Sequence, residues 1–223
     1  MEGSESKSVY ETHITVDPFD QGLLFAFIKQ QSDARMINLR PTCPQTFYGD
    51  YPIQPMLTYW YNGQDEDACD LATKTGIKME QFGMRVNRVK VEAAFSGSTV
   101  PDYADGEHYF EFHFKVAVAT NAEWNKLANM CALKGAHLSF NLYSKSGNMV
   151  PIVTIRLYHT TKQDALTNLQ SLVNAIKEDG FTLIGGVERE YSVMDSNVFL
   201  DQGWLFKENT KPDSGLFYVP IPL

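Results

Sequence analysis

A strand-like pattern that occurs twice, 100 residues apart, constrains the fold of this chain more than any other feature. Residues 10–16 read YETHITV and residues 110–116 read FEFHFKV, so an aromatic residue, a glutamate, a histidine and a valine recur in the same order. Alternation of apolar and polar side chains is typical of a strand that buries one face. If the segments that follow keep this offset, the chain consists of two copies of one unit.

The segments that follow the two short strands do keep the same order. Residues 21–31 and 121–134 carry apolar side chains at the spacing of an amphipathic helix, and Asp20 and Asn121 are suitable N-caps. Each half then continues with two strand-like segments, a second helical pattern and a last strand. The expected strands are residues 35–40, 55–61 and 85–92 in the first half and 136–143, 151–158 and 187–193 in the second.

The two halves differ in the clarity of the second helix and in their connections. Ala165 and Ile176 belong to a clear apolar stripe that ends near Gly180, whereas Gly76 interrupts the weaker stripe around Leu71. The expected connections between the second and third strands are a longer loop at 41–54 in the first half and a tight turn at Gly147 and Asn148 in the second.

Each half therefore predicts the order strand–helix–strand–strand–helix–strand, which is that of a ferredoxin-like unit. We expect an α+β protein with a tandem duplication of this unit, in which antiparallel sheets carry helices on one face. The expected repeats are residues 9–94 and 109–194, with a linker at 95–108 and a C-terminal tail at 195–223 that packs on the sheets. Paired units of this kind commonly form a pseudo-dimeric sandwich or an α+β barrel, and we expect one of these arrangements here.

Composition and charge narrow the classes of partner. The formal net charge is −8 and the isoelectric point is about 5.1, which argues against binding to a nucleic-acid backbone or an anionic membrane. The three cysteines form no CxxC pair, residues 1–8 are polar, and no run of 18 apolar residues occurs. We therefore expect a cytoplasmic protein, either a monomer or a homodimer.

The polar side chains of the expected strands would gather on the face of each sheet that carries no helix. Side chains alternate along a strand, so Glu11 and His13 lie opposite the apolar residues, as do Glu111 and His113. A chamber between two such faces is a plausible site for binding or reaction. The full expected set is His13, His113, His137, Glu11, Glu111, Glu188, Glu190, Arg88, Lys90, Lys115 and Arg156.

Three interpretations of this polar face remain open. It is a solvated sheet surface, since an antiparallel sheet can expose one side to water, and the chain is then a non-enzymatic ligand- or protein-binding module. It is a divalent-metal centre of an enzyme, because carboxylate and imidazole groups are metal ligands, and the ligands would be Glu11, His13, Glu111 and His113. It is a chamber for a small anionic ligand held by Lys115, Arg156 and Arg88.

Two short stretches carry a resemblance to a known family. The sequences His13-Ile14-Thr15 and His137-Leu138-Ser139 resemble the paired H-x-T/S motifs of the two-histidine (2H) phosphoesterases. The resemblance implies that His13 and His137 are the general base and general acid, and that Thr15 and Ser139 hold the phosphate. In this chain the residue that occupies the place of His13 in the second half is His113, within an H-x-K sequence. His113 is therefore a third candidate catalytic residue.

The stretches 137–141, 188–197 and 200–204 are also similar to motifs in a set of uncharacterised microbial proteins, and no activity follows from that similarity. Taken together, the residues predict that the chain binds a small anionic ligand, such as a phosphorylated one, in a polar chamber. One version of this prediction adds hydrolysis of the ligand by histidine general acid–base catalysis. The sequence names no cofactor beyond the divalent metal considered above.

Overall fold

The computed structural model describes residues 8–97, 100–144 and 149–205. The expected turn at Gly147 and Asn148 and most of the expected tail, residues 206–223, lie outside the described residues. The described chain is an α+β structure in which one large antiparallel sheet carries four α-helices, as the sequence predicts. None of the helices within these residues is long and apolar enough to cross a membrane.

The order of helices and strands in each half follows the strand–helix–strand–strand–helix–strand pattern of the sequence, with short additional strands. The first half contains β1 (Ser8–Val16), a 3₁₀ turn η1 (Pro18–Asp20), α1 (Gln21–Gln30), β2 (Ile37–Thr42), β3 (Pro44–Thr46), β4 (Met56–Gly63), α2 (Asp65–Gln81) and β5 (Val86–Ala94). The second half contains β6 (Tyr103–Ala104), β7 (Phe110–Ala117), α3 (Asn121–Leu133), β8 (His137–Asn141), β9 (Ile152–Leu157), β10 (Thr160–Thr161), α4 (Lys162–Glu178), β11 (Thr182–Asp195) and a second 3₁₀ turn, η2 (Val198–Asp201).

The strand order shows how the two halves combine. The large sheet has the order β2-β4-β1-β5-β11-β7-β9-β8-β3, and β6 pairs separately with β10. Within each half the last strand lies beside the first, followed by the third and the second, which is the ferredoxin-like order. The last strands of the two halves, β5 and β11, pair with each other and join the half-sheets into one.

The sheet also closes on itself, because its two outermost strands are consecutive in the chain. β2 pairs with β4 at one end of the order, and β3 pairs with β8 at the other. The residue between them is Cys43, whose backbone N–H donates to Asn141 Oδ1 (3.0 Å) and whose carbonyl accepts from the N–H of Leu142 (2.9 Å). The expected loop at 41–54 is therefore partly wrong, since it contains the short strand that closes the ring.

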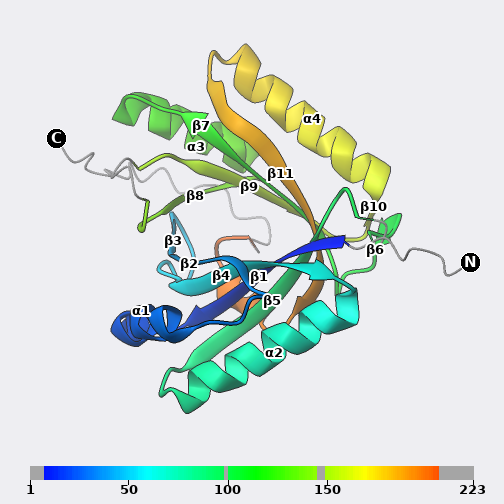
Figure 1. The fold of residues 1–223 in the computed structure, drawn as a ribbon. Helices are drawn as coiled ribbons and strands as arrows, with labels where there is room; N and C mark the ends of the chain where they lie inside the picture. The colour runs from blue at the N-terminus through cyan, green and yellow to red at the C-terminus, as the bar shows by residue number, and fades with distance from the viewer. Residues whose placement is uncertain (1–7, 98–99, 145–148, 206–223) are drawn as a thin grey trace, which may run out of the picture.

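The helices cover the outer side of this ring, as Figure 1 shows. α1 and α2 lie against the strands of the first half, and α3 and α4 lie against those of the second. The apolar faces of the strands are buried beneath them, with Ile14, Leu57, Phe112 and Val153 all fully or almost fully inaccessible. The polar faces consequently point into the ring.

One local expectation is met and another needs correction. The second helix expected in the first half is α2, which continues through Gly76. A Cβ atom at this buried glycine would lie 3.2 Å from Val89 Cγ2, so its absence lets the helix approach β5 closely. The N-cap of α3 is Thr120 rather than Asn121. The Thr120 hydroxyl accepts from the N–H of Glu123, and the Glu123 carboxylate accepts from the N–H of Thr120, which is a capping box.

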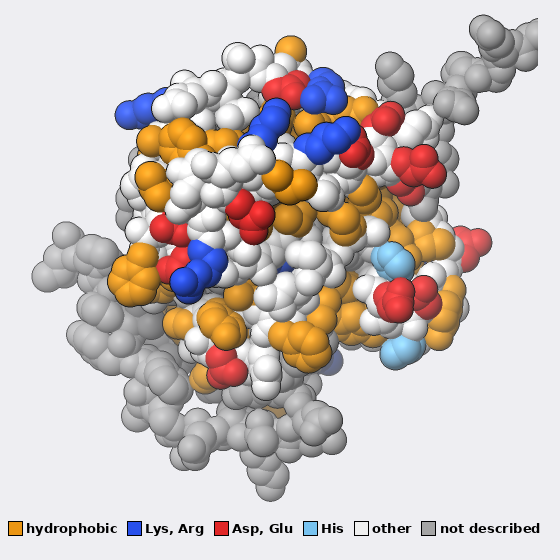
Figure 2. Space-filling view, turned by 90° about the horizontal axis from the view of Figure 1, so that it is seen from below, with side chains coloured by type: hydrophobic (Ala, Val, Ile, Leu, Met, Phe, Trp, Pro, Cys, Tyr) orange, Lys and Arg blue, Asp and Glu red, His pale blue; other side chains and the backbone are white. Residues whose placement is uncertain are grey.

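The outer surface carries no extended patch of one sign on the face that Figure 2 shows. Lysine and arginine side chains lie among acidic and apolar ones there. The expectation that the chain does not bind a nucleic-acid backbone stays a prediction from its acidic net charge.

The capping box of α3 provides a test of the corrected helix start. Thr120→Ala should lower the free energy of unfolding by about 1 kcal/mol, because it leaves N-terminal N–H groups of the helix without an acceptor. Asn121→Ala is the matched control and should change this free energy by less than about 0.5 kcal/mol. Urea denaturation of both variants checks the assignment, and a larger loss for Asn121→Ala would contradict it.

Candidate functional site

A cavity of about 530 Å³ lies inside the ring of strands and is lined by their polar faces. Both halves contribute to it, and so does η2. Of the residues expected from the sequence to form a site, the lining includes His13, His113, Thr15, Lys115, Ser139, Arg156, Arg88, Glu11 and Glu111. Apolar side chains such as Met56, Phe114 and Ile152 complete its wall. The cavity thus combines a charged region with an apolar one, as small-molecule sites commonly do.

His13 and His113 occupy equivalent positions in the two halves. His13 lies on β1 opposite Thr58 of β4, and its Nδ1 is 3.0 Å from the Thr58 hydroxyl. His113 lies on β7 opposite Thr154 of β9, and its Nδ1 is 2.9 Å from the Thr154 hydroxyl. A threonine on the third strand of each half therefore fixes the orientation of each imidazole ring, leaving Nε2 directed toward carboxylates.

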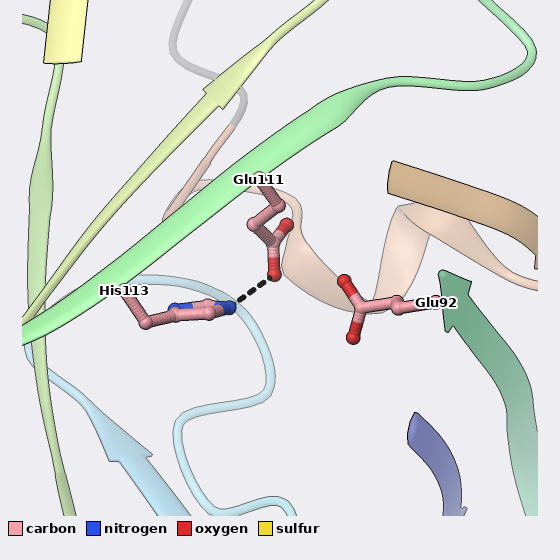
Figure 3. Close-up of side chains that lie close together, drawn as sticks. All are labelled: Glu92, Glu111 and His113. Carbon is pink, nitrogen blue, oxygen red and sulfur yellow. Dashed lines mark ion pairs between the residues drawn. The ribbon is translucent and has the colours of Figure 1, made fainter. Parts of the chain in front are cut away.

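Those carboxylates come from both halves. His13 Nε2 lies 3.4 Å from Glu92 and 3.8 Å from Glu11. His113 Nε2 lies 3.0 Å from Glu111 and 3.6 Å from Glu190. Figure 3 shows Glu111 directed toward the His113 ring, with Glu92 facing them from the other half of the sheet.

Lys90 connects the two halves at this point. Its Nζ is 2.7 Å from a carboxylate oxygen of Glu92 and 2.7 Å from one of Glu111. All three side chains are buried, so each charge is compensated by its neighbours rather than by water. Burial by itself raises the pKa of Glu111, but Arg156 and Lys90 outweigh it and hold that pKa well below its usual range.

Two arginines form the adjoining part of the network. Arg88 binds Asp195 through Nε (2.8 Å) and Nη2, and its Nη1 donates to Asp201 (2.8 Å). Arg156 binds Glu111 through Nε, and its Nη2 donates to the same Asp201 oxygen (2.8 Å). Both guanidinium groups are therefore engaged by carboxylates of this chain, and an added anion would compete with them.

The titration behaviour of the buried acids differs around the cavity. Burial, together with the charges of Glu92 and Glu11, raises the pKa of Glu190 well above its ordinary value. Glu190 therefore keeps its proton to a higher pH than an ordinary glutamate does, and in that form it can donate a hydrogen bond or a proton. Burial lowers the pKa of His113, but the neighbouring carboxylate of Glu111 outweighs this effect and raises it. The contact with Glu111 therefore favours the protonated form of His113.

Three residues that could together bind a metal ion lie close to one another here, but they are not the four ligands expected from the sequence. Ligand atoms of Glu92, Glu111 and His113 lie within 4.8 Å of one another, so Glu92 takes the place of the predicted Glu11 and His13. The Lys90 ammonium, however, already lies between the two carboxylates. A divalent ion would have to displace this cation, so the metal centre remains a prediction that Lys90 opposes.

His137 differs from the other histidine candidates. It belongs to β8, lies opposite Thr154 and contacts Trp204 with a ring separation of 6.5 Å, but it is not among the residues that line the cavity. The pairing of His13 with His137 that the phosphoesterase resemblance implies stays a prediction. The other half of that motif, Ser139, does line the cavity, as does Thr15.

Sequence reasoning missed several residues of the network. Asp201 and Asp195 belong to the segment expected as a tail and a turn, and Tyr109 precedes the expected strand. The Tyr109 hydroxyl donates to Asp195 (2.6 Å) and accepts from Arg88 (3.2 Å). No periodic pattern marks these positions, and only the tertiary structure brings them to the arginines.

Comparisons with known proteins give no family. No family model matches the sequence, and no curated protein does. Among solved structures, an anthrone oxidase-like protein aligns at 10% identity over 87% of this chain and 94% of its own, with a TM-score of 0.27. A putative monooxygenase from Fusobacterium nucleatum aligns at 9% identity over 92% of this chain and 100% of its own, with a TM-score of 0.33. At these TM-scores neither structure carries an argument about this chain.

The raised pKa of Glu190 predicts that the effect of Glu190→Gln on stability depends on pH. Because the pKa of Glu190 is higher in the folded than in the unfolded chain, this group reduces the free energy of unfolding as the pH rises above the unfolded value of about 4.3. Glu190→Gln keeps a neutral hydrogen-bonding group and removes this loss. The free energy of unfolding of the variant should therefore rise relative to that of the parent as the pH increases above about 4.3, by at most about 1.4 kcal/mol per pH unit.

Urea denaturation at a series of pH values measures this difference. The parallel variant Glu188→Gln is the matched control, since Glu188 lines the same cavity but is exposed, whereas Glu190 is buried. A free-energy difference between Glu190→Gln and the parent that stays constant from pH 4 to pH 8 would show that Glu190 is ionised in the folded chain.

The position of Lys90 between Glu92 and Glu111 predicts that a metal ion binds better once this cation is removed. Lys90→Met removes the cation between Glu92 and Glu111, so Mn²⁺ or Zn²⁺ should raise the melting temperature of the variant far more than that of the parent. Adding Glu92→Gln to this variant removes one ligand charge and should abolish the response. A parent protein that responds to either ion as strongly as the variant would contradict the opposing role of Lys90.

Proposed function

We propose that this chain binds a small anionic molecule in the cavity and transfers protons on it with His13 and His113. The observation that carries the proposal is the placement of two equivalent imidazole rings on one cavity of about 530 Å³. Each ring is oriented by a threonine at Nδ1 and faces carboxylates at Nε2. Fixing both rings in this way prepares them for proton transfer without further reorganisation.

The two rings have different tasks in this proposal. His113 is the general acid, because Glu111 lies 3.0 Å from its Nε2 and raises its pKa, which favours the protonated ring. His13 is the general base, which takes a proton from a bound water or from the ligand. For a phosphate ester, the water oxygen forms a bond to phosphorus as His13 removes its proton, and the bond to the leaving oxygen breaks as His113 protonates that oxygen.

Lys115 attracts the ligand in this proposal. It lines the cavity on β7, two residues beyond His113, and it makes no ion pair within the described residues. By contrast, Arg88, Arg156 and Lys90 are each paired with carboxylates. An anion that enters the cavity therefore meets Lys115 as an available positive charge on the strand that carries His113.

A binding protein without catalysis would use the same cavity, and turnover separates the two functions. We would first measure the melting temperature with phosphate, linear and cyclic nucleotides and short carboxylates. A ligand at 100 times its dissociation constant adds about 2.7 kcal/mol to the free energy of unfolding, which is a shift of several degrees. His13→Gln, His113→Gln and Lys115→Ala should each reduce the shift, whereas His108→Gln, a surface histidine outside the cavity, should leave it unchanged.

Hydrolysis of bis(p-nitrophenyl) phosphate then tests the chemistry. Loss of activity in both His13→Gln and His113→Gln, with His137→Gln active, supports the assigned pair. Loss in His13→Gln and His137→Gln, with His113→Gln active, would instead support the pairing implied by the phosphoesterase resemblance. A ligand that shifts the melting temperature without any turnover supports the binding protein, and the absence of any ligand shift would overturn the proposal.

A further inference from the structure

One carboxylate of this chain occupies the position of a bound anion at the end of the cavity. Asp201 is on the short turn η2, and it reaches inward between Arg88 and Arg156. Its Oδ2 accepts from Arg88 Nη1 and from Arg156 Nη2, both at 2.8 Å, and its Oδ1 accepts from Gln54 Nε2 at 3.1 Å. Two guanidinium donors and an amide donor thus hold both oxygens of one carboxylate, which is how proteins recognise carboxylate ligands.

The two arginines keep this arrangement by means other than Asp201. Arg88 is fixed by Asp195 through Nε and Nη2 and also donates to the Tyr109 hydroxyl. Arg156 is fixed by Glu111, and its guanidinium carbon lies 4.1 Å from the centre of the Tyr109 ring. The donors Arg88 Nη1 and Arg156 Nη2 therefore remain directed at one point when Asp201 is absent, so the carboxylate site is prearranged.

An unused polar group lies beside the same site. Thr15 lines the cavity, and its buried hydroxyl has no hydrogen-bond partner among the described residues. Thr15 is opposite Arg88 in the pairing of β1 with β5. Buried hydroxyl groups without a partner are uncommon in folded proteins, and a ligand that reaches the arginines would supply one here.

The segment that carries Asp201 is attached through a limited set of contacts. Leu200 and Trp204 are buried, and the carbonyl of Gln202 accepts from the N–H of Asp50 (3.1 Å). Phe199, which precedes them, is 72% exposed. The turn is therefore seated on the end of the ring, whereas the strands around it are held by continuous ladders of hydrogen bonds.

We propose that Arg88, Arg156 and Gln54 form a binding site for the carboxylate of a ligand, and that Asp201 occupies this site as an internal competitor. A ligand carboxylate that takes the place of Asp201 releases residues 198–205 from the end of the ring. The inference rests on the proposed function in one respect, that the ligand lies in the same cavity, and it narrows the anion to a carboxylate.

Substitution of Asp201 tests the site with acetate as the probe. Asp201→Ala removes the competing carboxylate and leaves space, so acetate should stabilise this variant saturably, at concentrations at least tenfold lower than the parent requires. Asp201→Asn keeps the space filled and should not respond beyond the effect of equal sodium chloride. Asp201→Ala combined with Arg156→Met should lose the acetate response, because one of the two guanidinium donors is gone.

Hydrogen exchange of the parent protein provides a second test that needs no variant. Saturating acetate should speed the exchange of backbone amides in residues 198–204 at least severalfold, while the amides of β5 and β11 stay protected. Unchanged exchange in that segment, or equal acetate responses in Asp201→Ala and Asp201→Asn, would overturn the inference.

The result can be separated from that of the proposed proton transfer. Asp201→Ala combined with His13→Gln should keep the full acetate response, since His13 makes no contact with the carboxylate site. Acetate binding without any turnover would therefore leave the carboxylate site standing and remove only the catalytic proposal. Turnover by a protein that fails both acetate tests would support the catalytic proposal and overturn the carboxylate site.

Discussion

Closing the sheet into a ring turns its charged faces inward, and every charge buried there must then be compensated by another. Glu111 carries the largest part of this task, because its two oxygens meet Lys90 from the first half and Arg156 and His113 from the second. Isolated buried ions are unstable by many kcal/mol, whereas a fully paired network is tolerated. The pairing of the two half-sheets therefore depends on this glutamate as much as on the ladder between β5 and β11.

The same network makes the two halves unequal. The strand order is the same in both, but Lys90 lies opposite His13 across the sheet, whereas Glu188 lies opposite His113. The two imidazole rings therefore have different charged neighbours on the last strand of their own half, although the strands that carry them occupy equivalent positions in the sheet order. Different tasks for the two rings on one ligand, as proposed above, require an asymmetry of this kind.

The sequence predicts the local part of this structure well, because alternation and helical spacing depend on neighbouring residues. The strand faces follow from the pattern around His13 and His113, and so does the order of elements. The sequence Thr120-x-x-Glu123 carries the capping-box signature and could have identified the helix start that Asn121 obscured. A barrel is one of the two expected arrangements, but the segment that closes it could not be predicted, because Pro44-Gln45-Thr46 has no strand pattern and pairs with residues almost 100 positions away. The role of Asp201 depends likewise on contacts that no local pattern encodes.

The short link at Cys43 has a consequence for the order in which the chain can fold. The first half is synthesised first, and its β2–β3 strand lacks the partner β8 until residues 137–141 have emerged. Its other outer strand, β5, waits still longer for β11. Until then the half-sheet exposes two unpaired edges. It also exposes a face whose charged side chains lack the ion-pair partners that the second half supplies. Completion of the ring is thus a late event of high contact order, and the nascent first half is the stage most exposed to pairing with the wrong chain.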